Sequence, residues 1–152
     1  MKIEDIIVSN DMPLERKTAI NLMYTTNVLQ DRTLEILKPF DLSTQQFNVL
    51  RILRGQHGKP ANLCTIQERM ITKMSNTTRL VDKLIKKDLV SRVTCEANRR
   101  KVEITITEKG LEVLAELDDP IEEHHKAMVK NLTKEQLNQF NEILEKLRDS
   151  GN

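Results

Sequence analysis

Residues 74–106 read MSNTTRLVDKLIKKDLVSRVTCEANRRKVEITI, and the spacing of the apolar residues changes partway through this stretch. Up to about residue 87 apolar side chains recur every three or four residues, which predicts a helix that buries Val81, Leu84 and Ile85. Beyond it, apolar and polar residues alternate on both sides of the polar joint 97–100, which predicts a β-hairpin with one buried face. The residues expected on that face are Val93, Cys95, Val102, Ile104 and Ile106.

A short helix is expected just before this stretch. Leu63, Ile66 and Met70 lie at helical spacing, and Asn62 has the side chain of a helix N-cap. The Gly- and Pro-containing segment 55–60 before it reads as a loop. The short helix, a turn and the helix near 74–87 have the order of a helix-turn-helix.

Capping residues mark where other helices begin. Ser43 opens a capping box of the S-x-x-Q type, and Thr107 and Thr133 head similar helix starts. With the apolar periodicity, these signals predict helices at about 13–38, 44–54, 108–130 and 134–148. Pro120 removes a backbone donor inside the third of these, so we expect a kink or a new start capped by Asp119.

The composition indicates a mainly helical fold. Four Gly, four Pro and four aromatic residues in 152 are too few for a β-sandwich or barrel, because those folds need many turns and favour aromatic residues. We therefore expect a single mainly α domain over 1–152 with a small β-hairpin wing. Residues of about 40–107 would form a winged helix-turn-helix, flanked by helical parts at about 1–39 and 108–152.

The charges are unevenly distributed, although the net charge is only +1. Residues 67–101 carry 10 basic and 4 acidic side chains, whereas residues 102–152 carry 6 basic and 12 acidic ones. A basic middle segment beside an acidic end is typical of a DNA-facing module attached to a separate helical body. A chance imbalance on solvated faces would give the same counts, so charge alone does not decide between the two.

The outward face of the expected helix at 74–87 carries side chains that can contact DNA. A helix fits the major groove, which is about 12 Å wide. Asn76 can bond adenine bidentately, and Arg79 can bond guanine, hold a phosphate or brace the wing. The candidate DNA-binding residues here are Ser75, Asn76, Thr78, Arg79, Lys83 and Lys86, with Lys83, Lys86 and Lys87 expected on phosphates. The alternative is a merely solvated helix face.

Arg99, Arg100 and Lys101 form a cationic cluster at the tip of the expected hairpin. A ribbon of this size can place an arginine in the minor groove, where a narrow groove concentrates negative potential. The alternative is a charged tip that only keeps the hairpin soluble. Next to a helix-turn-helix, we favour contact with DNA.

Several motifs resemble the MarR family of winged helix-turn-helix regulators. TRLVDKL at 78–84 resembles the recognition helix of that family. NRRKV at 98–102 and ITITEKG at 104–110 resemble its wing and the start of the following helix, and LSTQQF at 42–47 resembles an earlier helix start. The resemblance covers nearly the whole chain.

This resemblance implies a double-stranded DNA-binding transcription regulator, most often a repressor. It also implies a homodimer, built from the helices at 13–38, 108–130 and 134–148, on a pseudo-palindromic operator. In such regulators a small aromatic or anionic effector often releases the DNA, so the resemblance implies an effector pocket between the dimer helices and the helix-turn-helix. The rival interpretation is a winged helix used as a protein–protein interaction module without DNA binding. Basic residues on both the helix and the wing favour DNA.

Two positions depart from the usual pattern of the family. The family more often has Asp where this chain has Asn98, which leaves open whether a charged brace joins the wing to the helix-turn-helix. Asp88 stands where Gly is usual, at the left-handed position that ends the helix, at a cost on the order of 1 kcal/mol. Neither change alters the expected fold.

We assign no catalytic, metal or cofactor site. His124 and His125 are adjacent, hence about 100° apart on a helix, and His57 lies in a distant loop. Cys64 and Cys95 form no CxxC motif, and Cys95 is expected on a buried face, so both are expected to be structural. The sequence shows no pairing of a nucleophile with a base and no Gly-rich phosphate loop, so we expect no enzyme.

The chain is expected to be cytoplasmic. The short apolar run 6–8 follows two acidic residues and lacks the pattern of a signal peptide. No stretch approaches the roughly 18 apolar residues that a membrane helix needs. Two distant cysteines give no disulfide framework, which suits a reducing compartment.

Overall fold

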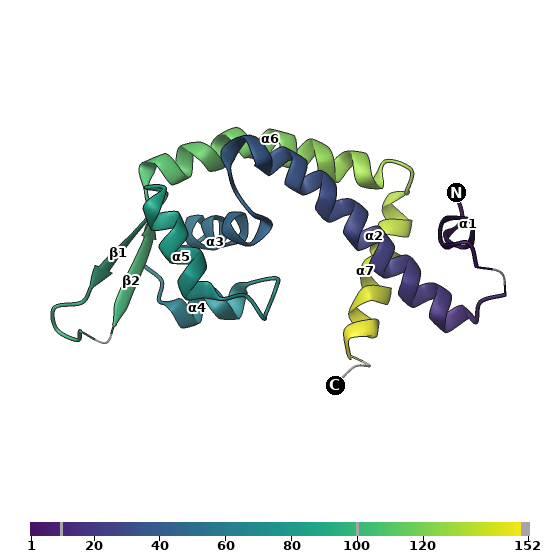
Figure 1. Ribbon diagram of the computed structural model, residues 1–152, viewed down its shortest axis with the longest axis horizontal. Coiled ribbons are helices and arrows are strands. Elements are labelled where there is room, and N and C mark those ends of the chain that lie inside the picture. Colours follow the sequence, from purple (N-terminus) through teal and green to yellow (C-terminus); the bar gives the residue numbers. More distant parts are fainter. Residues whose placement is uncertain (10, 100, 150–152) are drawn as a thin grey trace.

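The structure, a computed structural model, describes residues 1–9, 11–99 and 101–149. Figure 1 shows helices throughout and one projecting hairpin. The elements are α1 (Ile3–Ile7), α2 (Leu14–Leu37), the 3-10 helix η1 (Lys38–Phe40), α3 (Thr44–Arg54), α4 (Leu63–Arg69), α5 (Thr77–Lys86), β1 (Val90–Thr94), β2 (Val102–Ile106), α6 (Glu108–Val129) and α7 (Lys134–Asp149). The predicted fold class, mainly α with a small β-hairpin wing, is confirmed.

The long helices α2 and α6 pack against each other and connect the two ends of the molecule (Figure 1). At one end α3, α4, α5 and the hairpin project from the same side of α6, and α3 contacts α2, α4, α5 and α6. At the other end α1 packs on α2, and α7 lies next to the first half of α2. α5 is therefore packed on α3, and α3 is held by α2 and α6.

The hydrophobic core lies in the end that contains α3, α4, α5 and the hairpin. Leu50, Ile66, Val81, Ile104 and Leu114 come from α3, α4, α5, β2 and α6, and each is fully buried. Removing these apolar side chains from water fixes the three short helices against one another. By contrast, α7 contains no buried residue in the part that the structure describes.

The hairpin is antiparallel, and its base is attached to the body of the protein. Ile104 exchanges two backbone hydrogen bonds with Ala61, which lies just before α4, at 2.8 and 2.9 Å. The prediction of one continuous buried face is wrong for the outer half, because Val93 is 59% exposed and Cys95 is only half-buried. The outer half projects beyond the core, so side chains there have little to pack against.

Two helix boundaries differ from those predicted. α5 begins at Thr77 and not near residue 74, because Asn76 is its N-cap. α6 runs through Pro120 without a new start at Asp119. Pro120 is exposed, so water can hydrate the carbonyl that loses its helical partner there. The short elements α1 and η1 were not predicted, since five and three residues are too few to show a period.

The predicted capping bonds are confirmed. The Ser43 hydroxyl accepts from the N–H of Gln46, and Gln46 Oε1 accepts from the N–H of Ser43, both at 3.1 Å. The Thr107 hydroxyl accepts from the N–H of Gly110 at 3.1 Å. At the end of α5, Asp88 has a φ of 58°, as expected for the left-handed position. These local signals set where α3 and α6 begin and where α5 ends.

Candidate nucleic-acid interface

The turn between α4 and α5 is held in place by polar side chains on both sides. Gln67 on α4 donates from Nε2 to the carbonyl of Lys73 in the turn. Gln67 Oε1 accepts from the hydroxyl of Thr77, the first residue of α5. Asn48 on α3 accepts from the N–H of Ile71 at 2.9 Å. Because both ends of the turn are bonded to neighbouring helices, the start of α5 has a defined position on α3 and α4.

Ser75 and Asn76 close this turn and lie before α5, although we expected them on it. The Ser75 hydroxyl donates to the carbonyl of Thr72 at 2.7 Å. Asn76 Oδ1 accepts from the N–H of Arg79 at 3.1 Å, which is the bond of an N-cap. A bidentate contact with adenine needs both Oδ1 and Nδ2, and the cap directs Oδ1 toward the helix. The structure therefore gives Asn76 a structural role.

Thr78 and Arg79 lie in the first turn of α5, and both are exposed. The opposite face of the helix is buried through Thr77, Val81 and Leu84. Among the residues that the structure describes, Arg79 takes part in no ion pair. The outward face that the sequence predicts is thus present at this end of α5, with an arginine on it.

Lys83 and Lys86 lie further along α5, and both are exposed. Their side chains line a cleft of about 770 Å³ between α5 and the end of α2. Asp31 and Glu35 on α2 and Lys38 on η1 line the same cleft. The second half of α5 therefore faces a cavity with both acidic and basic side chains, whereas its first turn does not.

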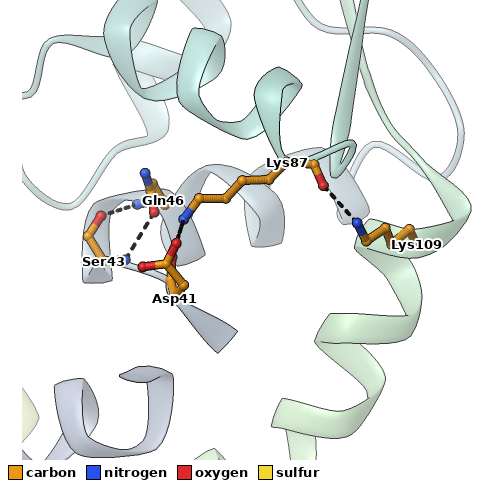
Figure 2. Close-up of polar contacts among 5 residues, drawn as sticks. All are labelled: Asp41, Ser43, Gln46, Lys87 and Lys109. Atoms are coloured by element: carbon orange, nitrogen blue, oxygen red, sulfur yellow. Dashed lines mark hydrogen bonds and ion pairs between the residues drawn. The ribbon is translucent and has the colours of Figure 1, made fainter. Parts of the chain in front are cut away.

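Lys87, which we expected on a phosphate, is bonded within the protein (Figure 2). Its Nζ lies 2.9 Å from a carboxylate oxygen of Asp41 and also donates to the Asp41 carbonyl. The carbonyl of Lys87 in turn accepts from Nζ of Lys109 on α6 at 3.0 Å. The end of α5 is therefore tied both to the turn before α3 and to the start of α6.

The start of α6 approaches the end of α5 closely. The Thr107 hydroxyl donates to the carbonyl of Asp88 at 2.7 Å, and the Thr107 N–H donates to the carbonyl of Leu89 at 3.1 Å. A Cβ at Gly110 would lie 2.4 Å from the Leu89 carbonyl oxygen and 2.7 Å from Cγ1 of Ile106. Only glycine allows this approach without a shift of the backbone.

An ion pair braces the wing against α5. Arg92 on β1 lies 3.1 Å from a carboxylate oxygen of Asp82 on α5. The hydroxyls of Ser91 and Thr105 are 2.8 Å apart across the two strands. A charged brace therefore does join the wing to the helix-turn-helix, and it is made by Arg92 and not by Arg79.

The tip of the hairpin carries exposed cations. The chain reverses there through bonds from the N–H of Cys95 to the Lys101 carbonyl, at 3.0 Å, and from the N–H of Lys101 to the Asn98 carbonyl, at 2.8 Å. Arg99 and Lys101 are exposed, while Arg100, the third predicted member of the cluster, lies outside the described residues. The hairpin points away from α6 (Figure 1), so its tip is at the edge of the molecule.

A second charged contact joins the winged part to α6. Arg54, the last residue of α3, donates two hydrogen bonds to the carboxylate of Asp118 on α6, both at 2.8 Å. This pairing lowers the pKa of Asp118 below its usual value of 3.8 and raises the pKa of Arg54. The two side chains remain 51% and 34% exposed, so the pair stabilises the fold only weakly.

The contacts of the cysteines and histidines indicate neither a reactive thiol nor a metal site. Cys64 Sγ donates to the carboxylate of Glu68 at 3.3 Å, which raises the pKa of the thiol and leaves less of the reactive thiolate. The rings of His124 and His125 lie 5.9 Å apart. Over the described residues no three His, Cys, Asp or Glu side chains are placed to hold a metal ion. Within the same part of the chain, every helix is too short or too polar to cross a membrane.

Sequence reasoning missed the residues that hold the site together. Asn48 and Gln67 each lie next to a buried residue in their helix. This position is the only local indication in the sequence that their side-chain amides form hydrogen bonds within the protein. The Arg92–Asp82 pair joins residues of different elements, so no spacing rule along one helix or strand predicts it. Such contacts become visible only when the fold brings the elements together.

Comparison with known proteins places this geometry in a family. Residues 42–102 match the model of the MarR family. The crystal structure of a MarR transcription factor from Planctomyces limnophilus is 30% identical, with a TM-score of 0.68, and the match covers 90% of this chain and 98% of that one. The HTH-type transcriptional repressor IacR of Pseudomonas putida is 27% identical over 135 residues, which are 89% of this chain and 77% of the repressor.

A further solved structure shares the fold at lower identity. It is that of BpsR from Bordetella bronchiseptica and concerns the regulation of its DNA binding by 6-hydroxynicotinic acid. It is 18% identical with a TM-score of 0.78, covering 92% of this chain and 99% of that one. The matched stretch 42–102 runs from the start of α3 through α4, α5 and β1, which are the elements that build the interface described above. With the identity and coverage of the Planctomyces protein, these matches show that the chain belongs to the MarR family of winged helix-turn-helix transcription regulators.

Proposed function

We propose that this protein binds double-stranded DNA sequence-specifically and that the first turn of α5 reads bases in the major groove. The observation that carries the proposal is that Thr78 and Arg79 are exposed at the start of a helix whose position is fixed by hydrogen bonds with Gln67 and Asn48. Because the start of α5 is already ordered, less conformational entropy is lost when it binds. Arg79 offers two parallel N–H donors to guanine, and Thr78 offers a hydroxyl and a methyl group.

The other predicted residues take supporting roles in this proposal. Ser75 and Asn76 stand where the N-terminal N–H groups of α5 and its helix dipole favour a phosphate. Arg99 and Lys101, with Arg100, contact the backbone or the minor groove beside the half-site. Lys83 and Lys86 add positive charge near the phosphate backbone of the DNA and also line the cleft between α2 and α5.

We propose that the protein acts as a homodimer. Large apolar side chains on α2 and α7 are exposed, among them Leu14 at 72%, Met23 at 67% and Ile143 at 60%. A groove of about 270 Å³ between these helices is lined by Leu14, Phe140 and Ile143. Monomers rarely leave such patches uncovered. A second copy covering them would place two recognition helices on a pseudo-palindromic operator.

We further propose that a small aromatic or anionic effector binds in the cleft between α2 and α5. Lys38, Lys83 and Lys86 supply positive charge there, while Leu34 and Leu42 supply apolar surface for a ring. Regulation of BpsR by 6-hydroxynicotinic acid supports this class of compound. A ligand held between α2 and α5 would favour one spacing of the two recognition helices over another, and thereby release the operator.

Sedimentation and the salt dependence of binding test the core of this proposal. The protein should be a dimer at micromolar concentration, since α2 and α7 would otherwise stay exposed. Its affinity for duplex DNA should fall steeply with salt, because each neutralised phosphate contributes about −0.9 to the slope of log K against log salt. A monomer, or a flat salt response, would contradict it, and the second result would favour a protein–protein interaction module.

A thermal-shift screen of aromatic acids, followed by a DNA-release assay, tests the effector. A compound that raises Tm and releases DNA in the native protein should lose both effects in Lys86→Ala. Lys59→Ala is the control, because Lys59 is an exposed cation outside the cleft and has no role in the proposed DNA contact. If no compound in a broad library releases DNA, the protein is a constitutive binder.

A further inference from the structure

Two large apolar side chains stand fully in solvent beside the recognition helix. Ile71 is 85% exposed and Met74 is 96% exposed, and both lie in the turn between α4 and α5. Most other exposed large apolar residues lie on α2, α6 and α7, where a second copy would cover them. The turn joins α4 to α5 below α6 in Figure 1 and belongs to none of these three helices, so the dimer faces proposed on α2 and α7 do not account for Ile71 and Met74.

The backbone that carries these side chains is fixed. The N–H of Ile71 donates to Asn48, and the carbonyl of Lys73, just before Met74, accepts from Gln67. The residue after Met74, Ser75, bonds the Thr72 carbonyl through both its hydroxyl and its N–H, at 2.7 and 3.2 Å. Ile71 and Met74 are therefore presented on an ordered turn that the protein holds in place with three side chains.

The charge around the turn selects the kind of partner. Lys73 lies between the two apolar residues, and the exposed Arg79 lies three residues after Asn76, the N-cap that closes the turn. The segment 67–101 as a whole carries ten basic and four acidic side chains. An apolar pair set among cations fits a polyanion that has apolar groups on its surface, and duplex DNA has one such group in its major groove, the C5-methyl of thymine.

We propose that Ile71 and Met74 pack against thymine methyl groups at the edge of the half-site that α5 reads, and so determine part of the sequence preference. The inference rests on the proposed DNA binding and adds a second reading element to it. Apolar contact with this methyl group distinguishes thymine from cytosine without any hydrogen bond. The prediction is a preference for A·T pairs at the base steps that face the turn.

Replacing thymine by deoxyuridine tests the contact directly, because it removes the methyl and leaves base pairing intact. The duplex is one selected by the native protein from a random pool, with each thymine replaced in turn. One or two replacements per half-site should each lower the affinity of the native protein for the duplex about fourfold, which is the effect of losing one buried methyl group. In Met74→Ala or Ile71→Ala the same replacement should have little further effect, while Met74→Leu should restore it.

Thr72→Ala is the matched control, since it changes an exposed side chain of the same turn and should leave the deoxyuridine effect intact. Both apolar side chains are exposed, so the alanine variants should unfold at the native Tm. The inference is wrong, while the proposed function stands, if the variants bind every duplex with the affinity of the native protein. It is also wrong if they lose the same affinity for the thymine duplexes as for the deoxyuridine duplexes. If the native protein selects no duplex at all, the proposed function itself fails, and the inference with it.

Discussion

Arg92 on β1 and Asp82 on α5 form an ion pair of 3.1 Å, and this pair connects the wing to α5. Their side chains remain 38% and 46% exposed. An ion pair with this exposure contributes about 0–1 kcal/mol to the free energy of unfolding. Its effect is therefore expected on the orientation of the wing and not on stability.

Asp82→Asn should weaken DNA binding although it removes a negative charge. If only net charge mattered, the substitution would strengthen binding to a polyanion. Because the wing would lose its brace, we expect a loss of severalfold in affinity, with the free energy of unfolding changed by less than about 1 kcal/mol. Glu96→Gln removes the charge of an exposed residue just before the hairpin joint without breaking this pair, and this variant should bind DNA at least as well as the native protein. If both variants gain DNA affinity equally, the Arg92–Asp82 pair does not orient the wing for binding.

Lys86 and Lys87 are adjacent but should behave differently. Lys87→Ala removes the ion pair and hydrogen bond to Asp41, and should lower the free energy of unfolding by about 1 kcal/mol. Lys86→Ala alters an exposed side chain and should leave stability within about 0.5 kcal/mol. Urea unfolding of the two variants measures the difference. Equal stabilities would show that the Lys87–Asp41 contact does not hold α5 in solution.

Gly110→Ala should destabilise the protein, against the usual trend for a helix. Alanine in a helix is favoured over glycine by about 1 kcal/mol, but here its Cβ would meet the Leu89 carbonyl oxygen at 2.4 Å. We expect a net loss of about 2 kcal/mol or more. Gly55→Ala is the control, because its Cβ would meet only ordinary contacts of 3.4 and 3.5 Å at a φ of −66°, and it should be neutral or stabilising. Two similar results would mean that α5 and α6 do not meet as closely as described.

The Arg54–Asp118 pair should make stability sensitive to acid. The pKa of Asp118 is lowered in the folded protein, so its contribution is present above the usual value of 3.8 and is lost as the pH falls through the lower folded value. Native protein should therefore exceed Asp118→Asn in free energy of unfolding by less than about 1 kcal/mol at neutral pH, and the gap should close below pH 3.8. Asp119→Asn, at the neighbouring exposed carboxylate, should show no such gap. A gap that widens in acid would have the wrong sign for this pairing.

The sequence predicts those parts of the fold that depend on local periodicity. α3 matches its expected range of 44–54, because a capping box and an apolar stripe act within a few residues of each other. α5 was placed by the same reasoning, with an error only at its start. The buried residues of the hairpin were predicted less well, since alternation does not reveal how far a ribbon extends past the core. Val93 shows this, being apolar and yet exposed.

The candidate site is only partly visible in the sequence. An exposed Arg79 at the start of α5 follows from helical spacing, which puts it opposite the buried Val81 and Leu84. The bonds from Gln67 and Asn48, the ion pair of Arg92, and the use of Lys87 by Asp41 all join elements whose relative position the sequence does not specify. For the same reason the exposure of Ile71 and Met74 could not be foreseen, because apolar residues near a helix are ordinarily assigned to the core.

Selection of duplexes from a random pool, with the native protein and with Arg79→Ala and Arg99→Ala, tests the central claim most directly. The native protein should select an inverted repeat with half-sites about 10 base pairs apart or a multiple of that. Arg99→Ala should select the same repeat at lower affinity, whereas Arg79→Ala should lose preference at one position in each half-site, worth about 1–3 kcal/mol. If the native protein selects no common sequence, or if Arg79→Ala selects the full native repeat, α5 does not read DNA in the way proposed here.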